Sequence, residues 1–304
     1  MTAGEMTVGR IDAMDQEAVE VWQPRSQIKW GTIARHAFLI VLCLWVLLPL
    51  AWVLLLSVKS LPDGTQRYIW PQNFADPIYS HYAFVLERTK DAVVAFRNSV
   101  LVTGLTVVAS TITAVLAGYA LVHLKTPWRG VIIGLLVASL FFPTRVTALL
   151  GIYNIQNRLG LINETWSLML PYTALSVAIS VFIMRGVFET VPKELVDSAR
   201  IDGAGTARVL TGIMLPLVRN GIVVVIIVNF VAAWGEYLLA LTLMNDADMR
   251  TLPVFIVSTS GGVGGSLWPR VAALYIIAIL PALITFAVAQ RWFIKGLQEG
   301  ALKA

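Results

Sequence analysis

The residues that most often carry chemistry are few in this sequence and lie far apart. The three histidines, His36, His81 and His123, lack the spacing of a helical metal site such as HExxH. Cys43 is the single cysteine, so an internal disulfide or a CxxC motif is impossible. No glycine is followed by lysine, which excludes a P-loop ATPase. Paired carboxylates and Ser-His pairs at workable spacing are also missing, so we expect no catalytic residues, no metal site and no cofactor on this chain.

A polar stretch at 194–216 is the only sizeable helix-forming polar segment in the C-terminal half. Glu194 and Asp197 fall in its first turns, where carboxylates complement the positive end of a helix. Pro192 is tolerated at a helix start, and we therefore predict a helix that begins near Val191.

Two glycines are predicted to end this helix. Gly203 and Gly205 offer positive φ angles that turn the chain, and a second helix is predicted from about Thr206. The first helix also carries four apolar side chains, Leu195, Val196, Ala199 and Ile201. Such a short helix outside a bilayer has little of its own chain to pack against, so we expect a protein partner. The alternative is a loop folded on the membrane surface.

Three further polar residues are candidates for a transport path. Glu236 is an ionisable residue in an apolar run, and such a residue faces protein or water more readily than lipid. We predict a pore or gate role for it, and the alternative is an interfacial carboxylate at a helix end. Asn154 and Gln156 are predicted to face an external vestibule.

The composition favours a membrane protein. Hydrophobic residues make up 57% of the 304 residues and charged residues 13%, and the mean hydropathy is +0.75. The formal net charge of +5 would suit nucleic acid, but the basic residues lie singly between apolar runs. We therefore expect membrane lipid and no nucleic acid as a partner.

Charge-free runs predict about six transmembrane helices in an all-α fold. The predicted spans are 36–58, 98–124, 130–151, 165–184, 220–244 and 271–290. An external loop with a short surface helix is expected at 59–96, and the segments 1–35 and 293–304 are expected as tails. Most of the 23 Lys and Arg residues then fall on one side, so the positive-inside rule predicts that both termini and the 194–216 stretch are cytoplasmic.

The polar stretch resembles the EAA loop of ABC importer permeases. The family's Glu-Ala-Ala, glycine and Ile-x-Leu-Pro positions hold Asp197, Ser198, Ala199, Gly203, Ile213, Leu215 and Pro216. Asp202-Gly203-Ala204 also matches the family pattern. Asp197 in place of glutamate and Ser198 in place of alanine are departures; one shortens a carboxylate and the other adds a hydroxyl.

Further pieces resemble the permeases of carbohydrate importers, specifically the maltose-transporter G type. They are Arg97-Asn98-Ser99, Leu159-Gly160-Leu161, Trp234-Gly235-Glu236-Tyr237, Arg250-Thr251-Leu252-Pro253 and the run 291–297. The resemblance implies a type I importer (MetI-like) transmembrane domain over 97–292. Its coupling loop would be 190–210.

The resemblance also implies partners. In the family this loop docks on an ABC ATPase dimer, which holds the ATP and Mg; the docking residues here would be Glu194, Asp197, Ser198, Ala199, Asp202, Gly203 and Ala204. A second homologous permease and an extracytoplasmic solute-binding protein are also implied. The binding-protein contact would be the glycine-rich loop, with Gly261, Gly262, Gly264 and Gly265; the alternative is a plain linker.

The leading hypothesis is therefore the permease subunit of an ATP-driven, binding-protein-dependent sugar importer in the bacterial cytoplasmic (inner) membrane. An importer of sn-glycerol 3-phosphate, an amino acid or another small polar solute is the alternative within this class. A self-contained secondary transporter or channel should show buried charged pairs or repeat-related broken helices, and neither is evident. A membrane enzyme has no supporting motif.

Overall fold

The computed structural model describes residues 30–63, 69–88, 90–141, 148–260 and 267–301. The chain forms two compact units, Met1–Leu50 and Ala51–Ala304. The described part of the first unit is the beginning of α1, and the second unit contains the other helices. The helices are α1 (Trp30–Val58), α2 (Ser80–Arg88), α3 (Lys90–His123), α4 (Arg129–Phe141), α6 (Leu149–Arg158), α7 (Thr165–Glu189), α8 (Lys193–Ile201), α9 (Thr206–Val209), α10 (Leu215–Leu217), α11 (Arg219–Trp234), α12 (Leu238–Leu243), α13 (Leu252–Ser260) and α14 (Trp268–Ala301).

The all-α class is confirmed, since the β-structure in the described ranges is one isolated bridge between Lys59 and Phe74. Four helices are long and apolar enough to cross a membrane, namely α1, α3, α7 and α14. A fifth crossing is available if residues 206–217 and α11, which are bent by 79°, form one span.

The predicted third span differs most from the structure. Its described part is α4, which at 13 residues is shorter than the roughly 20 residues that cross a bilayer core. Residues 149–151, which were expected to complete it, belong to the separate helix α6, and residues 142–147 lie outside the described part.

Three other segments differ in detail from the expected ones. Helix α3 begins at Lys90, so the end of the expected external loop is helical, and Ala92 and Ala95 pack in an apolar cluster with α13 and α14. Residues 252–260 were expected as loop and form α13, whose Pro253 stands in the first turn where proline is tolerated. Helix α14 continues to Ala301 through most of the expected tail 293–304.

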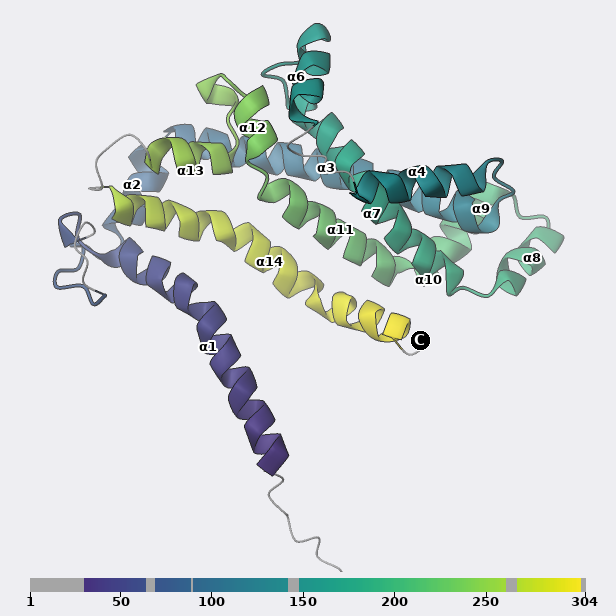
Figure 1. Ribbon diagram of the computed structural model, residues 1–304, viewed down its shortest axis with the longest axis horizontal. Helices are drawn as coiled ribbons and strands as arrows, with labels where there is room; N and C mark the ends of the chain where they lie inside the picture. The colour runs from purple at the N-terminus through teal and green to yellow at the C-terminus, as the bar shows by residue number, and fades with distance from the viewer. Residues whose placement is uncertain (1–29, 64–68, 89, 142–147, 261–266, 302–304) are drawn as a thin grey trace, which may run out of the picture. The chain divides into compact units, whose positions relative to one another are not determined.

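Helix α3 is the central element of the second unit. It packs against α7 and α11, and α11 also packs against α7 and α14 (Figure 1). Small residues make this close approach possible, as membrane helices require. At Gly118 of α3, an added Cβ would lie 2.9 Å from the Cβ of Met184 and 3.2 Å from the backbone nitrogen of Arg185. The prediction of a well-packed second span is therefore confirmed.

Candidate functional site

The predicted helix-turn-helix is present at 193–209. Helix α8 begins at Lys193, directly after Pro192, which is slightly later than predicted. Gly203 has a φ of +82°, and its N–H donates to the carbonyl of Arg200 at 3.0 Å. The N–H of Ala204 donates to the carbonyl of Ala199 at 2.9 Å, which closes the turn as a helix C-terminus usually does. Gly205 was expected to share this conformation but has a φ of −69° and precedes α9.

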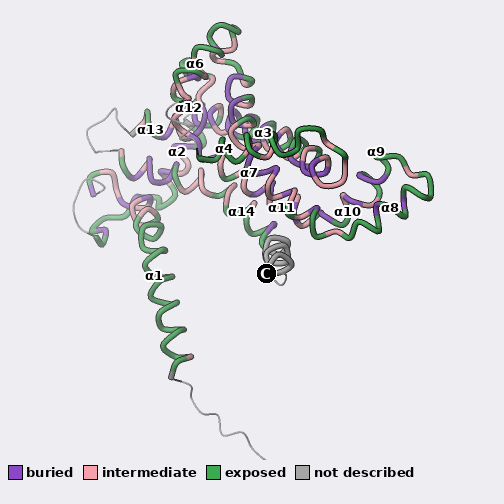
Figure 2. Tube along the Cα trace, turned by 45° about the vertical axis from the view of Figure 1, so that its right-hand side comes forward, coloured by how far each residue is buried: buried purple, intermediate pink, exposed green. Residues whose placement is uncertain are grey.

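Helix α8 divides its apolar residues between two surfaces. Val196 and Ala199 are buried in the apolar cluster that includes Tyr119 of α3 and Phe188 of α7. Ile201, by contrast, is 86% exposed and Leu195 is 43% exposed. Figure 2 shows the same division, with single buried positions in a mostly exposed helix. Ile201 and Leu195 therefore leave an apolar face of α8 that the described part of this chain does not cover.

The charged residues of α8 surround this surface. Glu194, Asp197 and Asp202 are exposed and form no ion pair with any described residue. Ser198, Gly203 and Ala204 lie on the same helix and turn; Ser198 and Gly203 are exposed, and Ala204 is half-buried. Of the predicted docking residues, Ala199 alone is buried against its own chain.

The buried face of α8 connects it to the transmembrane helices. Arg200 donates to the backbone carbonyl of His123, the last residue of α3, at 3.2 Å. Tyr119 and Phe188 meet edge to face with ring centroids 5.8 Å apart. After α9 the chain forms a π-helix, Leu210–Met214, whose Met214 is in the same cluster. Helix α8 is therefore packed in one apolar cluster with residues of α3, α7 and the start of α11.

Glu236 lies at a break between α11 and α12 and is buried. Its carboxylate accepts hydrogen bonds from the Tyr172 hydroxyl at 2.6 Å and from the backbone N–H groups of Leu239 at 3.0 Å and Ala240 at 3.2 Å. The residue therefore joins α7 to the start of α12, where a carboxylate satisfies N–H groups that lack helical partners. Its pore or gate role stays a prediction.

The other path candidates lie on different elements. On α6, Asn154 is exposed and Gln156 is buried, with its Oε1 lacking a hydrogen-bond partner. The predicted contact residues Gly261, Gly262, Gly264 and Gly265 lie outside the described residues.

Two of the short segments that resemble carbohydrate permeases, 97–99 and 250–253, contact each other in the structure. The side-chain amide of Asn98 donates to the carbonyls of Asp248 at 2.7 Å and Arg250 at 3.2 Å, and the Ser99 hydroxyl accepts from the N–H of Leu252 at 2.8 Å. These bonds hold the segment before α13 against α3. Nothing in the local pattern of either segment predicts this contact.

Sequence reasoning also missed a buried polar pair in the spans. The Ser180 hydroxyl of α7 donates to the Asn229 side-chain oxygen of α11 at 3.1 Å, and both residues are fully buried. Thr106 and Ser110 of α3 are buried as well, with hydroxyls that lack a described partner. The sequence does contain one signal for this pair, which is an asparagine, Asn229, in an otherwise apolar helix. Polar residues in spans usually face other helices or a path.

Comparison with known proteins identifies a family over most of this architecture. Residues 110–299 match the family described as the binding-protein-dependent transport system inner membrane component. A sulfoquinovosyl glycerol transport system permease protein, SmoH of Agrobacterium fabrum, is 33% identical over 84% of this chain and 89% of its own length. A melibiose/raffinose/stachyose import permease protein, MelC of Bacillus subtilis, is 29% identical over 84% of this chain and 91% of its own.

Other similar proteins differ in their named solute. An sn-glycerol-3-phosphate transport system permease protein, UgpE of Yersinia pestis, is 33% identical over 61% of this chain and 66% of its own. The fold is shared with a bacterial ABC transporter involved in the import of the acidic polysaccharide alginate. That chain superposes with a TM-score of 0.76 at 23% identity, covering 90% of this chain and 99% of its own.

Proposed function

Because this chain belongs to the family of binding-protein-dependent transport system inner membrane components, we propose that it is the permease subunit of an ATP-driven importer of a sugar or oligosaccharide. The family membership and the apolar helices make it a multi-pass component of the bacterial inner membrane. The family description also makes a solute-binding protein its partner. Transport, rather than catalysis, is the role of this component.

The observation that carries the proposal is the two-sided helix α8. Its buried face is fixed to α3 and α7 by Val196, Ala199 and the Arg200 bond to the end of α3. Its outer face presents Ile201 and Leu195 among unpaired carboxylates. This arrangement suits a lever that receives force from an ATPase subunit. ATP and Mg would be held by that subunit, and this chain would bind no cofactor.

Transport would follow alternating access. This chain would form half of the path together with a second, similar permease, and closure of the ATPase dimer would move α8 and the helices packed on it. The 79° bend before α11 and the break at Glu236 are places where such a motion can be accommodated. Asn229, Ser180 and Glu236 are buried polar residues, and they would supply polarity along the route of a hydrophilic solute.

A sugar is the favoured solute because two of the similar permeases are named for sugar-containing solutes, over most of this chain. The sn-glycerol-3-phosphate permease keeps glycerol phosphate as the alternative. An uptake assay with the cognate binding protein distinguishes the two classes. Uptake of a labelled sugar is measured in the presence of sn-glycerol 3-phosphate, and the reverse.

The docking role is tested by one substitution with a matched control. Ile201→Asp places a charge on the exposed apolar face of α8, and we expect co-purification of the ATPase subunits to fall at least about tenfold, since buried unpaired charge is costly at an interface. Leu150→Asp makes the same change at an exposed position on α6. Retention of the ATPase by Ile201→Asp, or its equal loss in both variants, would contradict the proposal.

A further inference from the structure

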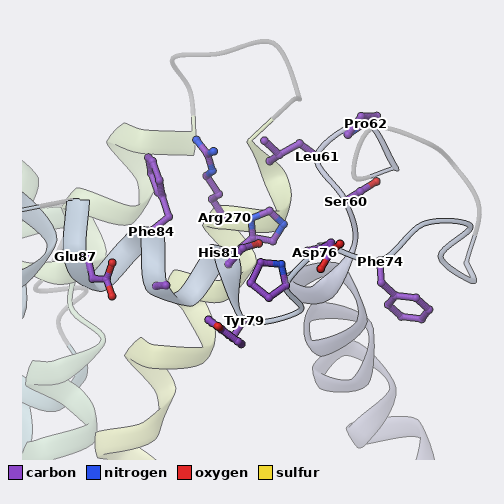
Figure 3. A pocket seen from close by; sticks show the side chains of 14 residues that line it. Ser60, Leu61, Pro62, Phe74, Asp76, Tyr79, His81, Phe84, Glu87 and Arg270 are labelled. Carbon is purple, nitrogen blue, oxygen red and sulfur yellow. The ribbon is translucent and has the colours of Figure 1, made fainter.

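A cavity of about 670 Å³ lies in the second unit (Figure 3). Helix α2, which lines it, lies at the opposite end of this unit from α8 (Figure 1). It is lined by residues from the segment after α1, from the loop before α2, from α2 itself and from the start of α14. Its volume is within the roughly 300–1,000 Å³ of ligand pockets. None of the candidate residues predicted from the sequence lies in it.

Arg270 is the cation of this cavity. Its guanidinium lies over the ring of Phe84, with the carbon Cζ 3.8 Å from the ring centroid. The buried Nε has no hydrogen-bond partner, and the side chain forms no ion pair with any described residue. Figure 3 shows Arg270 reaching from α14 beside Phe84 of α2. A guanidinium that is held against a ring and has N–H groups to spare can donate hydrogen bonds to the oxygen atoms of a ligand.

Two carboxylates line the same cavity. Asp76 and Glu87 are exposed, and neither is within ion-pair distance of a described cation. Among the described side chains that line the cavity, these two are the carboxylates. Carboxylates accept hydrogen bonds from hydroxyl groups, whereas Arg270 donates them.

The wall of the cavity is held by buried polar contacts. His81 is buried, and its Nε2 lies 2.8 Å from the carbonyl oxygen of Lys59. The Asp63 carboxylate accepts from the N–H groups of Gln72 at 2.6 Å and Asn73 at 2.7 Å. These bonds fix the segment that carries Asp76 and Tyr79, and Tyr79 is 64% exposed.

We propose that this cavity is a binding site for a neutral saccharide, with room for one or two sugar rings. This inference rests on the proposed import of a sugar. Arg270 donates to hydroxyl oxygens, Asp76 and Glu87 accept from hydroxyl groups, and Tyr79 offers an amphipathic ring for the apolar face of a sugar. Because the charged side chains of the described lining are two carboxylates and one guanidinium, the site disfavours a carboxylated or sulfonated sugar.

Binding to the full-length chain in nanodiscs of zwitterionic lipid tests the inference. Calorimetric titration uses maltose, melibiose and raffinose as neutral sugars and glucuronate as the anionic one. We expect at least one neutral sugar to bind more tightly than glucuronate. Arg270→Gln and the double change Asp76→Asn with Glu87→Gln should each raise its Kd at least about tenfold. Arg158→Gln, an exposed arginine on α6 away from the cavity, should leave Kd unchanged.

The outcomes separate this site from the transport role. Absence of binding by all three neutral sugars, tighter binding of glucuronate, or binding unaffected by both cavity variants would overturn the inference. The double variant replaces exposed side chains, so it keeps the test valid if Arg270→Gln fails to fold. ATP-driven sugar uptake by the assembled transporter, measured in parallel, reports on the proposed function alone, because uptake can persist without this cavity.

Discussion

Glu236 shows how a single side chain supports the helix break at which it lies. Its carboxylate takes up one hydroxyl and two backbone N–H groups in a buried site. Removing it takes this acceptor from the buried N–H groups of Leu239 and Ala240, and buried unsatisfied groups cost about 1–3 kcal/mol each.

Glu236→Ala is therefore expected to lower the free energy of unfolding by about 2–4 kcal/mol. Thermal unfolding of the purified chain in nanodiscs measures the change. Glu164→Ala is the control, since Glu164 precedes α7 without a side-chain capping bond and is exposed. Equal melting temperatures for both variants would show that the Glu236 bonds contribute no net stability.

Gly118 lies where α3 and α7 approach each other closely. A methyl group there meets the backbone and Cβ of Met184, whereas one at Gly104 of the same helix meets nothing within 4 Å. We expect Gly118→Ala to destabilise the chain by about 1–3 kcal/mol through overpacking. Gly104→Ala should be neutral or stabilising by up to about 1 kcal/mol, because alanine favours helix. Chemical denaturation of both variants checks this, and a stabilised Gly118→Ala would show that α3 and α7 are not closely packed.

At the scale of elements, the turn between α8 and α9 depends on one glycine. Gly203 has a positive φ and Gly205 does not, although both are exposed with open space around them. In Gly203→Ala, the left-handed conformation costs about 1–2 kcal/mol, because alanine has a Cβ atom. Helix α8 should then lose its fixed orientation, and the chain should bind the ATPase several-fold more weakly. Gly205→Ala should bind as the unmodified chain does. Measured affinities that fall equally in both variants would indicate that flexibility, not the turn, matters.

The elements also show what local sequence can predict. Uncharged apolar runs correctly predicted α1, α3 and α7, because crossing a bilayer needs a long apolar helix. Because glycine readily adopts a positive φ, the turn at Gly203 was predicted correctly. The same argument was wrong for Gly205, which has a negative φ. Helix α13 was missed, since its sequence borders a glycine-rich loop and its place depends on Asn98 and Ser99 of α3.

The candidate site was predictable only in part, because contacts between residues far apart in the sequence have no local pattern. Spacing identified α8, but which apolar residues remain exposed was decided by contacts with Tyr119 and Phe188, far away in sequence. The cavity around Arg270 joins residues from the segment after α1 to the start of α14, and no local pattern relates them.

For the whole molecule, the proposed role predicts that uptake depends on three partners. Proteoliposomes with this chain, a second permease and the ATPase should accumulate sugar only with internal ATP and external binding protein. A variant of the ATPase unable to hydrolyse ATP should reduce accumulation to the level without ATP. Accumulation of labelled sugar is the measurement, and uptake that persists without the ATPase would favour a self-contained transporter.

The bonds between α3 and the segment before α13 also bear on biogenesis. Asn98 and Ser99 bind groups 150 to 153 residues later in the chain. At about 5–20 residues per second of synthesis, α3 waits roughly 8–30 s for its partner to be synthesised. During this interval its polar end must be covered by water, lipid headgroups or insertion factors. Assembly of the bundle is thus delayed until translation has passed Leu252, and a chain truncated before that point leaves α3 incompletely bonded.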